Sequence, residues 1–330
     1  MHSSRKWRRG SFASSSHCSC ERRVAGEGGG PVAALTLKGR LDAYERLVRL
    51  DKPIGILLLL WPTLTALWLV TRGSPSLRMI VVFTLGTVVM RCAGCAFNDW
   101  ADMRYDAHVK RTAARPLVTG EIAPWEALAV AVAFALGGFL LVVIATNRAT
   151  VLLSFLALAI AIAYPFFKRF FAIPQAFLGI AFSFGIPMAF SAVLGYVSAF
   201  AWWYMLVNLF WVMAYDTEYA MVDRDDDLRI GMRTSAIAFG RFDVLAVAVC
   251  YALYFAGMAW VGVRLYMGVP YWAGLGIAVA IAVYHVWLIR GRDRMQCFRA
   301  FLHNHWLGLA IFAAVAADFA WRYQAWPRSL

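Results

Sequence analysis

The feature that most constrains this chain is a series of long apolar segments separated by mostly short polar ones. A helix that crosses a membrane needs about 20 largely apolar residues, because the hydrocarbon core is about 30 Å thick. Several segments also carry Trp or Tyr near their ends, where these side chains favour the membrane interface. We expect an all-α fold in a lipid bilayer, a polytopic bundle of about nine transmembrane helices at residues 54–71, 77–97, 124–146, 149–167, 172–194, 199–220, 242–263, 270–289 and 302–321.

The composition excludes an ordinary soluble globule. Hydrophobic residues make up 62% of the chain and charged residues only 15%, and the mean hydropathy is +0.62. Six cysteines at scattered spacings give no disulfide framework of the secreted type. Cys92 and Cys95 lie inside an apolar segment without further ligands for zinc, so we interpret them as small residues at a helix contact.

The distribution of positive charge predicts the orientation of the bundle. With a cytoplasmic N-terminus, 25 of the 32 Lys and Arg residues fall on the cytoplasmic side, and Arg91 lies within a span. Cytoplasmic loops of membrane proteins are rich in these residues. The net charge of +13 therefore indicates topology and does not indicate binding to nucleic acid.

The N-terminal residues 1–38 differ from the rest of the chain. They are rich in Arg and Ser, contain two acids, and lack the apolar core of a secretory signal. A mitochondrial transit peptide, a disordered basic tail and an overcalled translation start all remain open. We expect residues 1–38 to be a basic leader or targeting segment and residues 39–330 to form the transmembrane domain.

Acidic residues gather in two short windows, which hold nine of the 19 acids. In the first window Asn98, Asp102 and Asp106 are each about one helical turn apart, so they share one face of a helix, with Asp99 beside them. Carboxylates stacked in this way repel one another unless a cation compensates. The first window therefore predicts one half of a cation site.

The second window repeats the pattern. Asp216, Asp223 and Asp227 share a helical face, whereas Asp225 and Asp226 point elsewhere and are expected to be solvated acids. Mg2+ prefers oxygen ligands and is usually held by one or two carboxylates together with substrate phosphates. The two faces together predict a site for a Mg2+-bound diphosphate; the alternative is solvated loop acids paired with nearby arginines.

Basic residues follow each acidic window and could neutralise the oxygens of a diphosphate. Lys168 and Arg169 are the strongest candidates, because they emerge on the same side of the bundle as the acids. Their alternative role is to anchor the chain at the cytoplasmic interface. The other candidates are His108, Lys110, Arg111, Arg115, Arg229 and Arg233.

These windows resemble the paired Asp motifs of the UbiA-type intramembrane aromatic prenyltransferases. The resemblance covers about residues 44–325 and is closest to the branch of the family that prenylates 4-hydroxybenzoate in ubiquinone biosynthesis. It rests on Asn98-Asp99-x-x-Asp102-x-x-x-Asp106, on Asp216 through Asp223 to Asp227, and on the segments Arg49–Gly55, Leu60–Thr63, His108–Thr112, Arg115–Leu117, Tyr164–Arg169 and Tyr219–Asp227.

The resemblance implies an enzyme that binds a polyprenyl diphosphate through Mg2+, ionises the allylic carbon–oxygen bond, and lets the 3-position of 4-hydroxybenzoate attack the cation. Lys168 and Arg169 would stabilise the departing diphosphate, assisted by Lys110 and Arg115. The implied ligands of the metal and diphosphate are Asn98, Asp102, Asp106, Asp223 and Asp227, with Asp216 also at the substrate.

The resemblance also leaves a place for aromatic side chains and for the acceptor. The allylic cation needs shielding from water and contact with π faces. The acceptor carries a carboxylate, for which Arg49 and Lys52 are candidates. The aromatic candidates, each of which could equally be a packing residue, are Tyr164, Phe166, Phe167, Tyr219 and Trp100.

Three alternatives remain open. A transporter would use acids in its spans, but here the acids lie at cytoplasmic helix ends among basic residues. The same family also includes enzymes with other acceptors, such as haem, chlorophyllide, naphthoate or homogentisate. The expected location is a bacterial inner membrane, or a mitochondrial inner membrane if residues 1–38 are a transit peptide.

Overall fold

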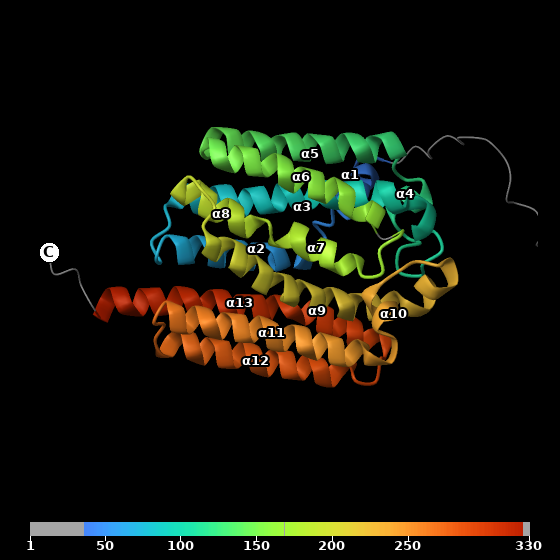
Figure 1. The fold of residues 1–330 in the computed structure, drawn as a ribbon. Coiled ribbons are helices and arrows are strands. Elements are labelled where there is room, and N and C mark those ends of the chain that lie inside the picture. Colours follow the sequence, from blue (N-terminus) through green and yellow to red (C-terminus); the bar gives the residue numbers. More distant parts are fainter. Residues whose placement is uncertain (1–35, 168, 326–330) are drawn as a thin grey trace, which may run out of the picture.

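The structure of this chain, a computed structural model, is a bundle of helices (Figure 1). It describes residues 36–167 and 169–325, with side chains up to Arg322. The elements are α1 (Leu37–Val48), α2 (Ile54–Val70), α3 (Leu77–Asp106), α4 (Pro116–Thr119), α5 (Pro124–Ala145), α6 (Arg148–Phe167), α7 (Pro174–Ser183), α8 (Gly185–Leu194), α9 (Ala199–Ile230), α10 (Ser235–Phe239), the 3-10 helix η1 (Gly240–Phe242), α11 (Asp243–Arg264), α12 (Val269–Ile289) and α13 (Arg294–Ala325). The all-α prediction is confirmed.

The long helices lie side by side, and the short helices α4 and α10 both lie at one end of the bundle (Figure 1). The helices α3 and α9 both finish at this same end, shown at the right of the figure. Because these two helices carry the acidic windows, the fold brings the two windows to one end of the molecule.

Seven helices of the described residues are long and apolar enough to cross a membrane. Two of the nine predicted spans are not among them. The helix α2 has only 17 residues, and α9 is less apolar because Trp, Tyr and Asn interrupt its first half. The seven are Leu77–Asp106, Pro124–Ala145, Arg148–Phe167, Pro174–Leu194, Ser235–Arg264, Val269–Ile289 and Arg294–Arg322.

The predicted continuous helix over residues 172–194 is interrupted in the structure. The chain forms α7 and α8, which meet at Phe184. Pro187 lacks the N–H that would donate to the carbonyl of Ser183, so the helical ladder is broken there. A Cβ on Gly185 would lie 2.2 Å from Oγ1 of Thr63, so a glycine allows α8 to approach α2 at the break.

Both acidic windows are continuations of long helices. The helix α3 runs without interruption to Asp106, and α9 runs to Ile230 before Gly231, at φ 72°, ends it in the left-handed conformation. The helical register predicted for the two windows is therefore present in the structure.

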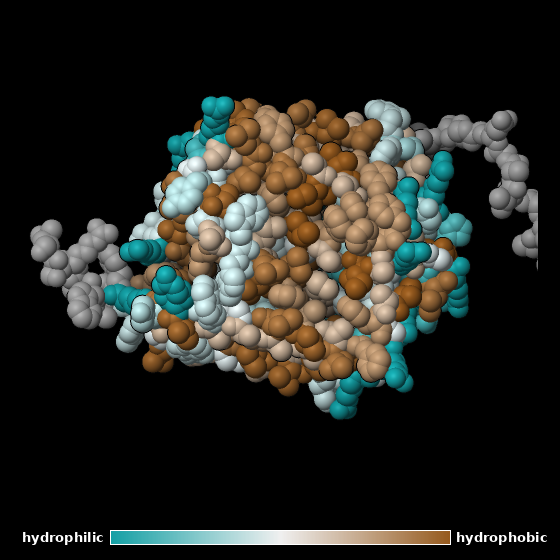
Figure 2. Space-filling model, in the orientation of Figure 1, coloured by the Kyte–Doolittle hydropathy of each residue, from teal (hydrophilic) through white to brown (hydrophobic). Residues whose placement is uncertain are grey.

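The surface fits a membrane environment. Figure 2 shows hydrophobic residues across the middle of the visible face and hydrophilic residues toward its two ends. The outward faces of α5 and α6 contribute large exposed apolar side chains, among them Leu136, Leu140, Ile144, Leu152 and Leu156. A soluble protein does not expose so much apolar surface, and in a bilayer this surface contacts lipid.

The helix α1 is fastened to the end of the bundle that carries the acidic windows. Ala43 and Leu47 are fully buried in a small apolar cluster with α3 and α5. On the polar side, Arg46 forms an ion pair with Glu121 at 2.5 Å. Since α1 begins at Leu37, it includes the last two residues of the predicted leader; residues 1–35 lie outside the described part of the chain.

Candidate functional site

An elongated cavity of about 640 Å³ runs through the bundle and reaches both acidic windows. Its walls come from α2, α3, α5, α6, α7, α8, α9 and α13. Along α3 the lining residues follow one helical face from the apolar middle of the helix to its acidic end: Val82, Phe83, Gly86, Thr87, Met90, Arg91, Gly94, Cys95, Asn98, Asp102, Tyr105 and Asp106. The cavity therefore joins an apolar channel to an acidic head.

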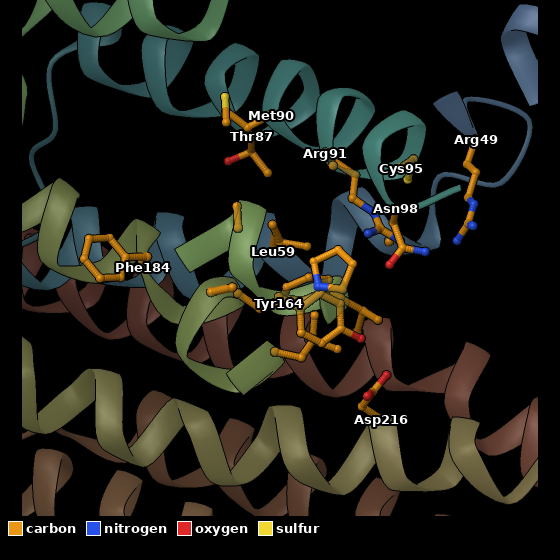
Figure 3. Close-up of a pocket in the computed structure, with 18 of the residues that line it drawn as sticks. Arg49, Leu59, Thr87, Met90, Arg91, Cys95, Asn98, Tyr164, Phe184 and Asp216 are labelled. Carbon is orange, nitrogen blue, oxygen red and sulfur yellow. The ribbon is translucent and has the colours of Figure 1, made fainter. Parts of the chain in front are cut away.

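The first acidic window presents its predicted face to this cavity. Asn98, Asp102 and Asp106 all line it, and the two acids are only 4% and 7% exposed. Figure 3 shows Asn98 pointing from α3 toward Tyr164 of α6, with Asp216 of α9 reaching into the same space. Residues more than 100 positions apart in sequence thus meet at one site.

The second window contributes Asp216, Asp223 and Asp227 to the same cavity. Asp223 accepts hydrogen bonds from Arg111, at 3.0 Å from Nε and 2.6 Å from Nη2, and the Arg111 guanidinium also lies 4.4 Å from the centre of the Tyr219 ring. Burial alone would lower the pKa of Arg111, but Tyr219 and Asp223 outweigh it, so that pKa is raised. Arg111, in the loop that follows the first acidic window, is therefore held by an acid of the second window.

The expectation that Asp225 and Asp226 are both solvated holds only for Asp225. Asp226 is 4% exposed and lies 3.2 Å from Arg294, which begins α13. Arg224 contacts the fully buried Asp243 at 3.3 Å, so it does not pair with the acids of the second window as the alternative interpretation would require. The rotation of α9 directs these side chains away from the cavity and toward α11 and α13. The sequence alone does not show that α11 and α13 pack against this face of α9.

Arg49 and Arg115 join the site through a buried acid. Both line the cavity, and both contact Asp99, which is 1% exposed, at 2.6 and 3.0 Å. Arg115 also forms an ion pair with Asp106. Burial lowers the pKa of Arg49, but the charge of Asp99 more than compensates and the pKa is raised. The Arg49 guanidinium is therefore a fixed positive charge.

The other predicted basic residues are placed less centrally. Lys110 and Arg169 are exposed and are not among the residues that line the cavity. The Arg169 guanidinium donates to the carbonyl of Ala101 at 3.1 Å, which holds it beside the end of α3. Lys52 is exposed and lies at the cavity wall, whereas Lys168 lies outside the described residues.

Arg91 is a cavity residue that the sequence reasoning treated only as a charge within a span. It lines the cavity two turns from Asn98, and a Cβ on Gly55 would lie 2.5 Å from its Nε, so that glycine makes room for it. Among the described residues no acid lies within ion-pair distance of Arg91, and its guanidinium contacts the Phe182 ring at 5.4 Å. An intramembrane arginine is costly and was itself a signal of function.

The predicted aromatic residues divide into two groups. Tyr164 and Tyr219 line the cavity, and Phe301 of α13 stacks on Tyr219 at 4.3 Å and lines it too. Trp100, Phe166 and Phe167 are not among the lining residues. Phe167, for example, stacks on Phe177 at 3.8 Å, which is a packing contact.

A buried polar network lies on the opposite face of α9. Glu218 is completely buried and accepts hydrogen bonds from Tyr251 of α11 and from Asn304 of α13, both at 2.8 Å. His285 of α12 lies 3.0 Å from the Tyr251 hydroxyl. The network links α9 to three other helices and so fixes how α9 is rotated relative to the cavity.

The donor set fits a hard divalent cation. The acids that line the cavity supply only carboxylate oxygens, which suit Mg2+. Within residues 36–167 and 169–325, no three Asp, Glu, His or Cys side chains form a ready-made metal cluster. Mg2+ usually takes one or two carboxylates from a protein and completes its coordination with water and phosphate oxygens.

Comparison with known proteins identifies the family. The model of the UbiA prenyltransferase family matches residues 59–315, most of the described chain. The chain belongs to the UbiA prenyltransferase family. A 4-hydroxybenzoate octaprenyltransferase of Cupriavidus necator is 60% identical over 283 residues, which are 86% of this chain and 99% of that protein. One from Burkholderia lata is 58% identical over 280 residues, 85% of this chain and 97% of that protein.

Solved structures agree with the assignment to the UbiA family. A UbiA homolog from Aeropyrum pernix K1 has a TM-score of 0.69 and 28% identity, covering 80% of this chain and 97% of that one. A UbiA homolog from Archaeoglobus fulgidus bound to GPP and Mg2+ has a TM-score of 0.63 over 83% of this chain and 99% of that one, and at 19% identity it shows the fold alone. The family resemblance seen in the sequence is confirmed.

Proposed function

We propose that this chain transfers a polyprenyl group from polyprenyl diphosphate to the 3-position of 4-hydroxybenzoate in ubiquinone biosynthesis. The observation that carries the proposal is a cavity in which an apolar channel ends between two acidic helix faces. The relatives named 4-hydroxybenzoate octaprenyltransferase, 58–60% identical over nearly their whole length, support the choice of acceptor. A bacterial inner membrane is the proposed location, and a mitochondrial inner membrane remains the alternative.

The acidic head would hold the diphosphate through Mg2+, as proposed by analogy with the UbiA homolog bound to GPP and Mg2+. Bound Mg2+ supplies positive charge that makes diphosphate a better leaving group. The proposed ligands are Asn98, Asp102, Asp106, Asp223 and Asp227.

Basic side chains around the acidic head would stabilise the departing diphosphate. Arg111 and Arg115 line the cavity beside Asp223 and Asp106 and can donate several hydrogen bonds to phosphate oxygens. The roles proposed for Lys168, Arg169 and Lys110 stay predictions. Fixed donors of this kind cost little reorganisation when charge develops on the leaving group.

The middle of the cavity would host the reacting carbon and the acceptor ring. Tyr164 and Phe301 line the cavity and can offer π faces to an allylic cation, whereas the Tyr219 ring is already covered by Arg111 and Phe301. The surrounding apolar walls limit access of water. Asp216 reaches into the same space and could accept a hydrogen bond from the acceptor hydroxyl. Arg49 and Arg91 are the cavity cations that could take the acceptor carboxylate.

The test is transfer of a radiolabelled prenyl diphosphate to 4-hydroxybenzoate by detergent-solubilised protein, with Mg2+ or with EDTA. We expect Mg2+-dependent product from the wild type and loss of product in Asp102→Asn and Asp223→Asn. Asp225→Asn is the matched control, because it makes the same change in charge on an exposed acid outside the cavity.

Two results would change the conclusion. Transfer to another aromatic acceptor, but not to 4-hydroxybenzoate, would keep the chemistry and replace the substrate. Equal, EDTA-insensitive activity in the wild type and in both cavity variants would remove the proposed role of the acidic faces.

A further inference from the structure

Asp99 differs from the other acids of the first window in the direction of its side chain. Asn98, Asp102 and Asp106 line the cavity, but Asp99 does not, and it is 1% exposed. A position adjacent to Asn98 on a helix is turned by 100°, which directs Asp99 behind the cavity wall, toward α1 and α4. Its role is therefore separate from that of the acids that face the substrate.

The single carboxylate of Asp99 holds two guanidinium groups. Its Oδ1 atom lies 2.6 Å from Nη2 of Arg49 and 3.0 Å from Nη1 of Arg115. Both arginines line the cavity although the acid that holds them does not. A buried carboxylate shared by two arginines is an arrangement that fixes both side chains at once.

The backbone restrains both arginines as well. Arg115 precedes Pro116, which favours the extended conformation found there, with φ −68° and ψ 144°. Arg49 ends α1 in the left-handed region at φ 59°, which is uncommon for a residue other than glycine. Such conformations persist where the surrounding structure enforces them, and they gather at functional sites.

The local charges leave room for one more anion. Arg49 and Arg115 face two acids, Asp99 and Asp106, so this corner is balanced as it stands. When Asp106 serves the metal and diphosphate, one positive charge is no longer offset. An arginine has five N–H donors, and Arg49 uses only Nη2 for its hydrogen bond within the described chain. The pair can therefore accept a substrate oxyanion.

We propose that Asp99 is a positioning residue that holds Arg49 and Arg115 as a two-arginine clamp for a substrate oxyanion. The oxyanion is either the carboxylate of the acceptor or the diphosphate of the donor, which present the same chemistry to a guanidinium. The inference rests on the proposed prenyl transfer, and it assigns to the acid in the second place of the motif a task other than metal binding.

The test measures KM for the donor and for 4-hydroxybenzoate separately in Asp99→Asn. We expect KM for one substrate to rise about tenfold, the equivalent of one charge-assisted hydrogen bond, while kcat changes much less. The substrate whose KM rises identifies the oxyanion. Asp225→Asn, with the same loss of charge on an exposed acid, should leave both KM values at the wild-type level.

A double-mutant cycle separates this role from a merely structural one. If Asp99 acts through its partners, the effect of Asp99→Asn on KM should largely disappear when Arg49→Gln and Arg115→Gln are already present. The proposal would be overturned if the effects of Asp99→Asn and of the arginine substitutions on KM were fully additive. It would also be overturned if Asp99→Asn lowered the melting temperature but left both KM values unchanged.

Two further outcomes are distinguishable. Should Asp99→Asn fail to fold, Arg49→Gln and Arg115→Gln must each raise KM for the same substrate, and unchanged KM values in both would refute the clamp. A wild type that transfers no prenyl group to any aromatic acceptor would refute the proposed function itself.

Discussion

Two glycines of α3 predict how donors of different length respond to substitution. Gly86 and Gly94 line the cavity, and a Cβ built on either has no atom within 4 Å. Counting from Asp102, Gly94 lies eight residues away and Gly86 sixteen, which are about 12 and 24 Å along the helix axis. Leu at either position would place a side chain in the channel at a known distance from the acidic head.

The expected loss depends on whether the prenyl chain reaches the new side chain. The main chain of geranyl diphosphate has about eight carbons and cannot extend beyond about 12 Å at about 1.5 Å per bond. Gly94→Leu should therefore impair both geranyl and octaprenyl diphosphate, whereas Gly86→Leu should impair only the octaprenyl donor. Overpacking typically costs about 1–3 kcal/mol, or about 5- to 150-fold in kcat/KM.

The assay is competition between the two radiolabelled donors in detergent, with kcat/KM determined for each. Gly276→Leu is the control, because Gly276 is also helical with open space around its Cβ but does not line the cavity. Leu favours a helix over Gly by up to about 1 kcal/mol, so loss of helix stability cannot explain the effect. Equal loss for both donors in Gly86→Leu, or none in Gly94→Leu, would refute this orientation of the channel.

Two predictions concern stability. Glu218→Leu should leave one buried N–H of Asn304 unpaired, because Tyr251 can still donate to Oδ1 of Asn304, and the other Asn304 N–H keeps its bond to the carbonyl of Ala300. At about 1–3 kcal/mol for that donor, the substitution should lower the melting temperature in detergent more than Glu218→Gln, which keeps one acceptor oxygen; equal melting temperatures would contradict the network. The hydrogen bond from Arg46, followed by that from Thr119, lowers the pKa of Glu121. The stabilisation that the charged Glu121 carboxylate gives to the attachment of α1 is complete above the ordinary glutamate pKa of about 4.3. It is lost as the pH falls through the lowered pKa of Glu121 in the folded protein, so α1 should become sensitive to protease only in that acidic range. Unchanged cleavage there, or Glu121→Gln behaving as the wild type, would argue against this tether.

The sequence by itself determined the class of fold and the chemistry of the acidic windows. Apolar segments of membrane length favour a helical bundle, because a helix pairs its own backbone N–H and C=O groups and unpaired groups are costly in lipid. The spacing of Asn98, Asp102 and Asp106 fixed a common helical face, because the period of a helix is a local property. In the structure, this face of α3 and the face of α9 that carries Asp223 line the same cavity.

Only the tertiary structure decided which charged groups meet. Arg111 and Asp223 are 112 positions apart, and Asp226 and Arg294 are 68 apart, so no local pattern pairs them. The same holds for Arg91, which the sequence places within a span but which only the packing of α2 against α3 directs into the cavity. Helical periodicity sets the face on which a side chain lies, whereas its partner depends on the rotation and contacts of neighbouring helices, which long-range packing determines.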